Sequence, residues 1–286
     1  MRARLREPGG IPERDPRHQE RLANRRRSNL DGAIRSPVSL RAPADSQQRR
    51  FWTSTFWDNL RKAWRVRYPT AVISWRSKLL YYPVPKAASS SVKRLLARIE
   101  GKRYAGIPQH EIEFDCVWGG QAARFCDFTS FTVIRNPWDR FLSCYLDKIR
   151  SRSDDPACSG RPNIHEGFLR YNQILGRKLF HSEMSLHDFA EVVSWIPDSI
   201  ADEHFRSQYR MFSAPDGTPL ASRIIKFEQL PDGVTSLLRE VGVDEIELEA
   251  SNRTRHGNYR EFYDRATREL VGRRYRRDIE QFGYAF

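Results

Sequence analysis

Residues 78–101 read KLLYYPVPKAASSSVKRLLARIEG, and this stretch indicates the fold class of the chain. An apolar run with β propensity ends at Pro83 and Pro85, three serines follow, and a helical pattern with one apolar face continues to Ile99. Gly101 stands where a glycine commonly ends a helix. The stretch therefore predicts a strand, a loop and a helix, the repeating unit of α/β proteins. It lacks the glycines of a standard phosphate-binding loop.

The alternation of strand and helix patterns continues to the C-terminus. Further β-prone runs occupy residues 70–75, 128–134 and 222–227. Helical patterns occupy residues 136–150, begin at Ser185, pass through 234–241 and begin again near Asp264. This order predicts an α/β fold, a three-layer sandwich with a mainly parallel central sheet. Residues 102–127 show no clear pattern, and the polar residues 151–165 are expected to form a loop.

The first 50 residues differ in composition from the remainder. They hold 13 Arg against 6 Asp and Glu, a net charge of +7, which leaves +6 of the formal +13 for the other residues. Because this segment also has five prolines and no apolar periodicity, we predict a disordered Arg- and Pro-rich arm over residues 1–50. A basic arm also suits a nucleic-acid-binding protein, which is one alternative function.

Residues 51–68 begin the folded part, which we predict to span 51–286. Between basic positions, an aromatic or leucine side chain recurs every four residues, at Trp52, Phe56, Leu60 and Trp64. This spacing predicts an amphipathic helix that packs its aromatic side chains on the core. The alternative is a surface that contacts a membrane or stacks on sugars, since Trp and Arg together suit both.

Targeting and redox signals are few. No apolar run approaches the roughly 18 to 20 residues that span a membrane, and no signal peptide is evident at the N-terminus. The four cysteines form no C-x-x-C pair, which disfavours both a disulfide framework and a zinc site. These features predict a cytoplasmic protein, membrane-peripheral if residues 51–68 contact a bilayer.

Two strand-loop-helix junctions are basic, and ligands of parallel sheets gather at such junctions. The first offers an ammonium, hydroxyls and helix-terminal N–H groups to an anion, from Lys86, Ala87, Ala88, Ser89, Ser90 and Ser91. The small alanines let a ligand approach the backbone closely. At the second junction, Arg135 at a strand end and Ser143 in the next helix suit another phosphate, although a surface salt bridge and an ordinary helix position would explain them singly.

A nucleoside triphosphate bound with magnesium fits these junctions poorly. The G-x-x-x-x-G-K-[ST] motif is absent, and residues 128–134 lead into Arg135 rather than into a metal-binding Asp. The second alternative function is a nucleotide-dependent kinase of related P-loop fold. It is disfavoured because the sequence lacks the metal ligands that such a kinase needs.

Together the two junctions resemble the cytosolic and Golgi sulfotransferase superfamily, and most closely its carbohydrate O-sulfotransferase branch. VPKAASSSVKRLL is similar to the 5′-phosphosulfate loop of that family. FTVIRNPWDRFLSCYLDKI resembles its 3′-phosphate motif, F-x-V-R-[DN]-P-x-x-R-x-x-S-x-Y, at Arg135, Pro137, Arg140, Ser143 and Tyr145. The resemblance covers about residues 70–286. Luminal members of the family carry a membrane anchor and paired cysteines, which the sequence does not show. The chain therefore looks more like a bacterial cytoplasmic relative.

The resemblance implies a P-loop-like fold and transfer of a sulfuryl group from 3′-phosphoadenosine 5′-phosphosulfate (PAPS) to a carbohydrate or glycolipid hydroxyl, without a metal. Lys86 would face the oxygen that gains charge as 3′,5′-ADP leaves. The resemblance also implies a histidine between the two motifs as general base, which here is His110, with Glu111 or Glu113 as alternatives. His204 fits a family D-x-H-x-x-x-Q pattern and is a second candidate catalytic residue, expected to bind the acceptor, with the role of base as the alternative. Arg253 and Arg255 are further candidate anion contacts.

Overall fold

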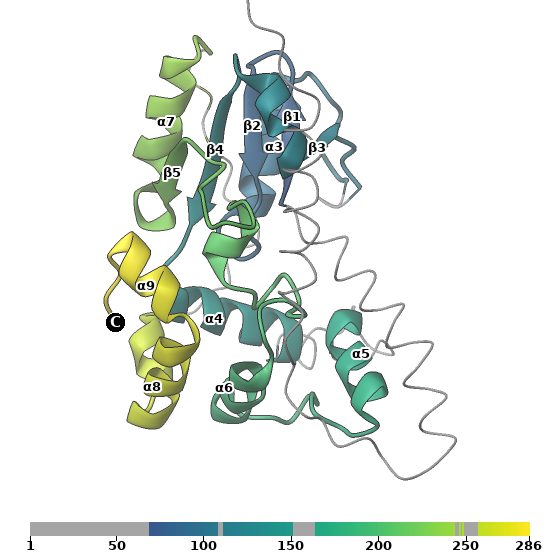
Figure 1. Ribbon diagram of the computed structural model, residues 1–286, viewed down its shortest axis with the longest axis vertical. Helices are drawn as coiled ribbons and strands as arrows, with labels where there is room; N and C mark the ends of the chain where they lie inside the picture. The colour runs from purple at the N-terminus through teal and green to yellow at the C-terminus, as the bar shows by residue number, and fades with distance from the viewer. Residues whose placement is uncertain (1–68, 108–110, 151–163, 244–245, 247, 249–256) are drawn as a thin grey trace, which may run out of the picture. The chain divides into compact units, whose positions relative to one another are not determined.

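The computed structural model describes residues 69–107, 111–150, 164–243, 246, 248 and 257–286 (Figure 1). The predicted arm (1–50) and amphipathic helix (51–68) lie outside the described residues and stay predictions. None of the helices in the described ranges is both long and apolar enough to cross a membrane.

A five-stranded sheet in the order β3-β1-β2-β4-β5 forms the centre of the fold. Its strands are β1 (Thr70–Ser74), β2 (Leu79–Tyr82), β3 (Cys116–Trp118), β4 (Thr129–Ile134) and β5 (Arg223–Lys226). β2 pairs in parallel with β4, and β4 with β5, whereas β1 is antiparallel to both of its neighbours. Four strands therefore run in one direction and β1 in the other. The strands are mainly parallel in direction, as expected, but two of the four pairings are antiparallel.

The antiparallel part of the sheet arises from a tight connection after β1. The Lys78 N–H donates to the carbonyl of Trp75 (3.4 Å), and Lys78 has a φ of 49°, so the chain turns directly into β2. A connection this short permits only antiparallel pairing, since parallel strands need a crossover. β3 was not predicted, because it has three residues and only its central Val117 is buried.

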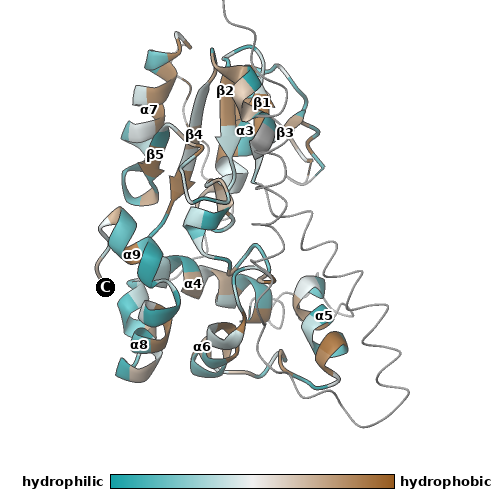
Figure 2. Ribbon diagram, in the orientation of Figure 1, coloured by the Kyte–Doolittle hydropathy of each residue, from teal (hydrophilic) through white to brown (hydrophobic). Residues whose placement is uncertain are grey.

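Helices complete a hydrophobic core around the sheet. All four residues of β2 are buried, and because successive side chains of a strand point to opposite faces, both faces of β2 are covered. Apolar residues of α3 (Ser89–Ile99) and α7 (Leu230–Glu240) belong to this core. Figure 2 shows hydrophobic residues along the central strands. The α/β class predicted from the sequence is confirmed.

A second hydrophobic cluster contains no strand. It joins side chains of α4 (Pro137–Tyr145), α5 (Glu166–Leu175), α6 (Leu186–Trp195) and α8 (Arg265–Arg274), with Ile279 of α9 (Arg276–Phe282) packed against it. In Figure 1 these helices gather beyond the end of the sheet from which β4 leads into α4. The second junction therefore lies where the two clusters meet.

Capping residues determine where several helices begin. The side chain of Asn136 accepts a hydrogen bond from the N–H of Trp138 (3.1 Å), and Ser185 forms a capping box with Asp188, both as predicted. The predicted C-terminal helix begins after Asp264 but is interrupted at Tyr275, which separates α8 from α9. The predicted helix over 136–150 also changes character, since residues Leu146–Arg150 form a π-helix.

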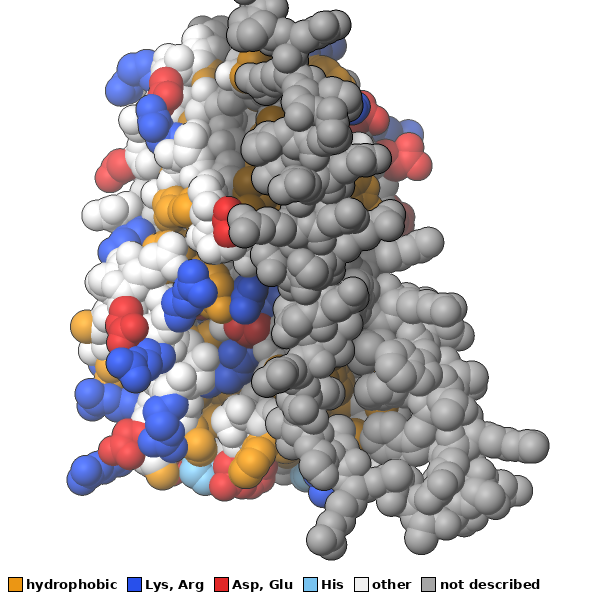
Figure 3. Space-filling view, in the orientation of Figure 1, with side chains coloured by type: hydrophobic (Ala, Val, Ile, Leu, Met, Phe, Trp, Pro, Cys, Tyr) orange, Lys and Arg blue, Asp and Glu red, His pale blue; other side chains and the backbone are white. Residues whose placement is uncertain are grey.

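Basic and acidic side chains are interspersed on the face around α8 and α9 (Figure 3). Arg265 pairs with Glu269 at 3.0 Å and Arg276 with Glu280 at 2.7 Å, each one helical turn apart. These pairs offset part of the positive charge of the two helices, which together hold six arginines.

Candidate active site

The loop after β2 is bent by two left-handed residues that are not glycine. Lys86 has a φ of 68° and Ala88 a φ of 58°. Such conformations cost about 1 to 3 kcal/mol each and persist where the surrounding structure holds them. The Ala87 side chain between them is fully buried, which fixes the bend in the core. Left-handed residues turn neighbouring N–H groups toward one side, an arrangement that suits anions.

The start of α3 adds further donors to this loop. Its N-cap is Ala88, whose side chain makes no cap hydrogen bond, and its first turn has no acidic residue. The first N–H groups of a helix have no partner within the helix and carry the positive end of its dipole. Ser89 and Ser90 are half-buried and Ser91 is buried, so the three serines do not simply face solvent. This helix start can bind a phosphate or sulfate group.

The Lys86 ammonium lies close to a carboxylate that sequence reasoning missed. Lys86 Nζ is 2.6 Å from Asp147 Oδ2, which Lys148 also contacts at 3.1 Å. Burial lowers the pKa of Lys86, and the Asp147 carboxylate acts in the opposite direction. Burial alone would raise the pKa of Asp147, but Lys86 and Lys148 bring it down to about 2. Asp147 therefore stays ionised near neutral pH and favours the charged form of the partly buried lysine.

Arg135 joins the second junction to the first. Its guanidinium donates to both carboxylate oxygens of Asp139, at 2.8 and 2.9 Å, and to the carbonyl of Lys86 at 3.1 Å. The guanidinium also lies over the Phe227 ring, 4.4 Å from its centroid. Among contacts between described residues, three of its five N–H donors have partners, which leaves two for a ligand. The structure thus brings the two predicted junctions into direct contact.

Arg140, a residue of the second motif, connects the first junction to the segment that carries His204. Its side chain is almost completely buried and donates to three carbonyl oxygens, those of Pro85 (2.9 Å), Glu203 (3.1 Å) and Arg206 (2.8 Å). Pro85 precedes Lys86, and Glu203 precedes His204. One guanidinium therefore holds the backbone next to both predicted site residues.

The helix α4 contributes two buried residues between these segments. Ser143, the second predicted contact of this junction, is 2% exposed. Burial raises the pKa of the neighbouring Cys144 thiol to about 12, and the charges of Lys86 and Asp202 also act on it.

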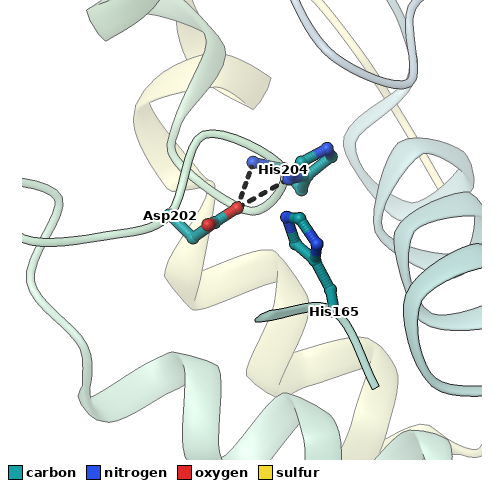
Figure 4. Close-up of side chains that lie close together, drawn as sticks. All are labelled: His165, Asp202 and His204. Carbon is teal, nitrogen blue, oxygen red and sulfur yellow. Dashed lines mark hydrogen bonds and ion pairs between the residues drawn. The ribbon is translucent and has the colours of Figure 1, made fainter. Parts of the chain in front are cut away.

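His204 is held by Asp202, and His165 lies beside them (Figure 4). One oxygen of Asp202 is 2.7 Å from His204 Nδ1 and accepts the backbone N–H of His204 at 2.9 Å. Burial acts to raise the pKa of Asp202, but its hydrogen bonds with His204 and the charges of the histidines lower it. An ionised carboxylate only accepts hydrogen bonds, so Nδ1 of His204 is the donor and Nε2 of the neutral ring is an acceptor.

The other predicted residues are not part of this arrangement as the described residues show it. His110, Arg253 and Arg255 lie outside the described residues, while Glu111 and Glu113 are exposed. Sequence reasoning missed Asp147, Asp202 and His165 as site residues. Asp202 carried a signal, because it is the first residue of the D-x-H pattern, whereas His165 was hidden in a segment expected to be a loop.

One family model matches this arrangement of motifs. The description of the family is "Sulfotransferase family", and the match covers residues 69–285, most of the chain. The chain belongs to the sulfotransferase family. Membership in it implies a transferase, and the recognition made from the two phosphate motifs is confirmed. No curated protein and no solved structure matches the chain significantly.

The arrangement offers groups that suit sulfuryl transfer. Loop and helix N–H groups, with Lys86 and Arg135, can hold an anionic donor at the ends of β2 and β4. His204, oriented by Asp202, presents an acceptor nitrogen that can take up a proton.

Proposed function

We propose that the chain moves the sulfuryl group of PAPS to a hydroxyl of a carbohydrate or glycolipid and releases 3′,5′-ADP. The observation that carries the proposal is the hydrogen bond from Arg135 to the carbonyl of Lys86 (3.1 Å). It joins two anion-binding junctions into one site, which suits a donor with a phosphate at each end of its ribose. The acceptor class rests on the resemblance of the two motifs together, residues 84–96 and 131–149, to the carbohydrate O-sulfotransferase branch.

The donor phosphates divide between the two junctions in this proposal. The loop 83–88 and the first turn of α3 bind the 5′-phosphosulfate, and Arg135 with Ser143 binds the 3′-phosphate. In transfer, a bond forms between acceptor oxygen and sulfur while the bond from sulfur to the 5′-phosphate oxygen breaks. Lys86 stabilises the negative charge that this phosphate oxygen gains.

We assign proton removal from the acceptor hydroxyl to His204. Its hydrogen bond with Asp202 fixes the ring and leaves Nε2 with a lone pair, as in other histidine and carboxylate pairs. His110, which the family resemblance favoured, lies outside the described residues and remains the alternative base.

Nucleotide binding tests the donor assignment. Calorimetry should show tighter binding of 3′,5′-ADP than of 5′-AMP, because only the former offers a 3′-phosphate to Arg135. Losing a charge-assisted contact costs about 1.5 to 3 kcal/mol, roughly 10- to 100-fold in affinity. Arg135→Lys should reduce this preference, since an ammonium cannot reproduce the fork of the guanidinium. Equal affinity of the wild-type chain for both nucleotides would exclude the proposed donor site.

The reaction itself is tested by incubating the chain with PAPS and a set of oligosaccharides and glycolipids. Mass spectrometry should then detect products that carry one added sulfuryl group, together with 3′,5′-ADP. If 3′,5′-ADP binds but no carbohydrate is modified, the donor assignment holds and the acceptor class is wrong.

A further inference from the structure

Three side chains that commonly bind metal ions lie close together, and one of them is the proposed base (Figure 4). His165, Asp202 and His204 each offer a ligand atom, and these atoms lie within 4.8 Å of one another. All three residues are half-buried. They come from two segments distant in sequence, the start of α5 and the turn before residues 207–211. The cluster is therefore a product of the fold.

The hydrogen bond that orients His204 accounts for Asp202 but not for His165. The His165 ring stands nearly perpendicular to the His204 ring, at 86°, with the centroids 4.7 Å apart. Its backbone N–H donates to the carbonyl of Lys148 (3.3 Å), which anchors the start of α5 beside α4. The His165 imidazole thus lies against Asp202 and His204, although the proton transfer proposed for His204 does not require a second imidazole.

Gly167 provides a separate indication that this space is kept open for polar groups. A Cβ at this position would overlap Asp202 Oδ2 and lie 3.3 Å from His165 Nε2. Only a residue without a side chain lets the carboxylate and the imidazole approach the same turn of α5 so closely. Since Gly167 has an ordinary negative φ, the crowding around its Cβ explains the glycine better than backbone strain does.

Two imidazoles and one carboxylate are ligands that suit Zn²⁺ and similar ions, and three protein ligands leave a fourth position open. We propose that His165, Asp202 and His204 bind Zn²⁺, and that the ion inhibits transfer rather than serving as a cofactor. Zinc bonds of about 2.0 to 2.2 Å require the three ligand atoms to draw in to about 3.3 Å from one another. Binding of the ion to His204 Nδ1 also moves the proton of the neutral ring from Nδ1 to Nε2, because the nitrogen that binds a metal must be deprotonated.

Inhibition follows from occupation of the base. With Zn²⁺ on Nδ1, the neutral His204 ring carries its proton on Nε2, so this nitrogen can no longer take the proton of the acceptor hydroxyl. This consequence rests on the proposed function, whereas binding itself does not. The two are therefore measured separately.

Binding is measured on the full chain after removal of metals with a chelator. Zn²⁺ is titrated in competition with a chromophoric indicator, and we expect one ion per chain at this site. His165→Ala should weaken that binding by more than the roughly 10- to 100-fold typical for loss of an outer partner of a metal site. Gly167→Ala should weaken it as well, through the overlap with Asp202.

The matched control is His187→Ala on α6. His187 also lies near a carboxylate, with 3.7 Å between its Nε2 and Glu191, but belongs to no three-residue cluster among the described residues. Zn²⁺ affinity should not change in this variant. Cys116 and Cys126 are exposed and could bind zinc elsewhere, so Co²⁺ serves as a second probe. Its absorption should lack the intense near-ultraviolet bands of cobalt bound to thiolate.

Equal Zn²⁺ affinity of the wild-type chain and His165→Ala would overturn the site, as would thiolate bands with Co²⁺. If circular dichroism shows that His165→Ala does not fold, the Zn²⁺ affinities of His165→Gln and Gly167→Ala are compared with wild type instead. With binding established, Zn²⁺ should abolish transfer and a chelator should restore it. Binding without inhibition would overturn the inhibitory role and count against His204 as base, while 3′,5′-ADP binding would still support the donor site.

Discussion

Each cationic side chain at the centre of the site already has a carboxylate partner. Asp147 faces Lys86, and Asp139 binds Arg135 through both oxygens. A carboxylate beside a candidate anion site repels the anion, so the presence of these two carboxylates has to be explained. For Lys86 the reason is its partly buried ammonium, whose pKa would fall further without Asp147. The two carboxylates hold the cationic side chains in place, and Asp147 also favours the charged form of Lys86.

Asp147→Asn should change how nucleotide affinity depends on pH. Burial lowers the pKa of Lys86 and Asp147 raises it, so the variant loses the raising effect. A lysine with a lowered pKa loses its charge at a lower pH, so Lys86 should become neutral at a lower pH in the variant than in wild type. Calorimetry with 3′,5′-ADP from about pH 7 to 10 should therefore show affinity falling at lower pH in the variant than in wild type.

The control for this variant is Asp127→Asn. Asp127 also pairs with a lysine, Lys78, at 2.9 Å, but both side chains are exposed and belong to neither junction. The pH dependence of 3′,5′-ADP binding should match wild type in this control. An identical pH dependence in Asp147→Asn would mean that Asp147 does not support the charge of Lys86.

His204→Ala should lower kcat without much change in affinity for 3′,5′-ADP. Loss of a general base typically reduces the rate by about 100- to 10,000-fold, whereas loss of an acceptor contact acts mainly on the acceptor KM. The measurement is the initial rate at saturating PAPS with the acceptor varied. His187→Ala is the control. If His110→Ala abolishes kcat while His204→Ala retains it, the base is His110 and His204 binds the acceptor.

Among the elements, those with local signals were predicted well. α3 ends just before Gly101 and α6 begins after Ser185, as predicted, because capping residues and apolar spacing act within a few residues. α7 (Leu230–Glu240) overlaps the predicted 234–241 but begins four residues earlier. β3 and α5 were missed, since β3 has only three residues and α5 buries only Phe168. The π-helix that places Asp147 beside Lys86 was not predicted either, because the apolar pattern of the sequence does not distinguish a π-helix from an α-helix.

The candidate site divides in the same way. The phosphate loop and Arg135 were found because strand-loop-helix order brings the ends of β2 and β4 together. The contacts of Arg140 with Pro85, Glu203 and Arg206 were not found, because each depends on the packing of segments distant in sequence. Tertiary hydrogen bonds to backbone carbonyls leave no pattern in a single sequence.

Arg140→Lys should destabilise the fold although it keeps the charge. A lysine cannot serve three carbonyl oxygens from three directions, so at least two lose their donor. At about 1 to 3 kcal/mol for each unsatisfied buried group, the free energy of unfolding should fall by about 2 to 6 kcal/mol in urea titrations. Arg265→Lys, on the exposed face of α8, should stay within about 0.5 kcal/mol of wild type. Equal effects of the two variants would rule out the proposed role of Arg140.

On the scale of the whole described structure, a buried carboxylate connects the C-terminal helix to the site. Asp278 of α9 is fully buried and accepts the N–H groups of Gln208 (2.7 Å) and Tyr209 (3.0 Å). The Gln208 side chain in turn exchanges two hydrogen bonds with the backbone of Arg135, at 2.9 and 2.8 Å. The conformation of the second junction thus depends on α9.

Asp278 also predicts how stability depends on pH. Burial raises its pKa to about 6, above the value of 3.8 expected for an exposed carboxyl group. A raised pKa means that the folded state binds the proton more tightly, so this group favours folding most below pH 3.8 and least above pH 6. Two pKa units correspond to about 3 kcal/mol. Asp147 and Asp202, whose pKa values are lowered, act in the opposite direction, but mainly below pH 4.

Between about pH 6 and 4 the contribution of Asp278 should therefore dominate the difference between wild type and Asp278→Asn. As the pH falls through this range, the unfolding free energy of wild type should rise by up to about 3 kcal/mol relative to the variant, which cannot titrate here. The histidines contribute equally to the unfolding free energies of both proteins, so their contribution cancels in the difference. This difference is measured by urea unfolding at several pH values. A constant difference across the range would show that Asp278 is ionised in the fold throughout, and that its two N–H donors outweigh its burial.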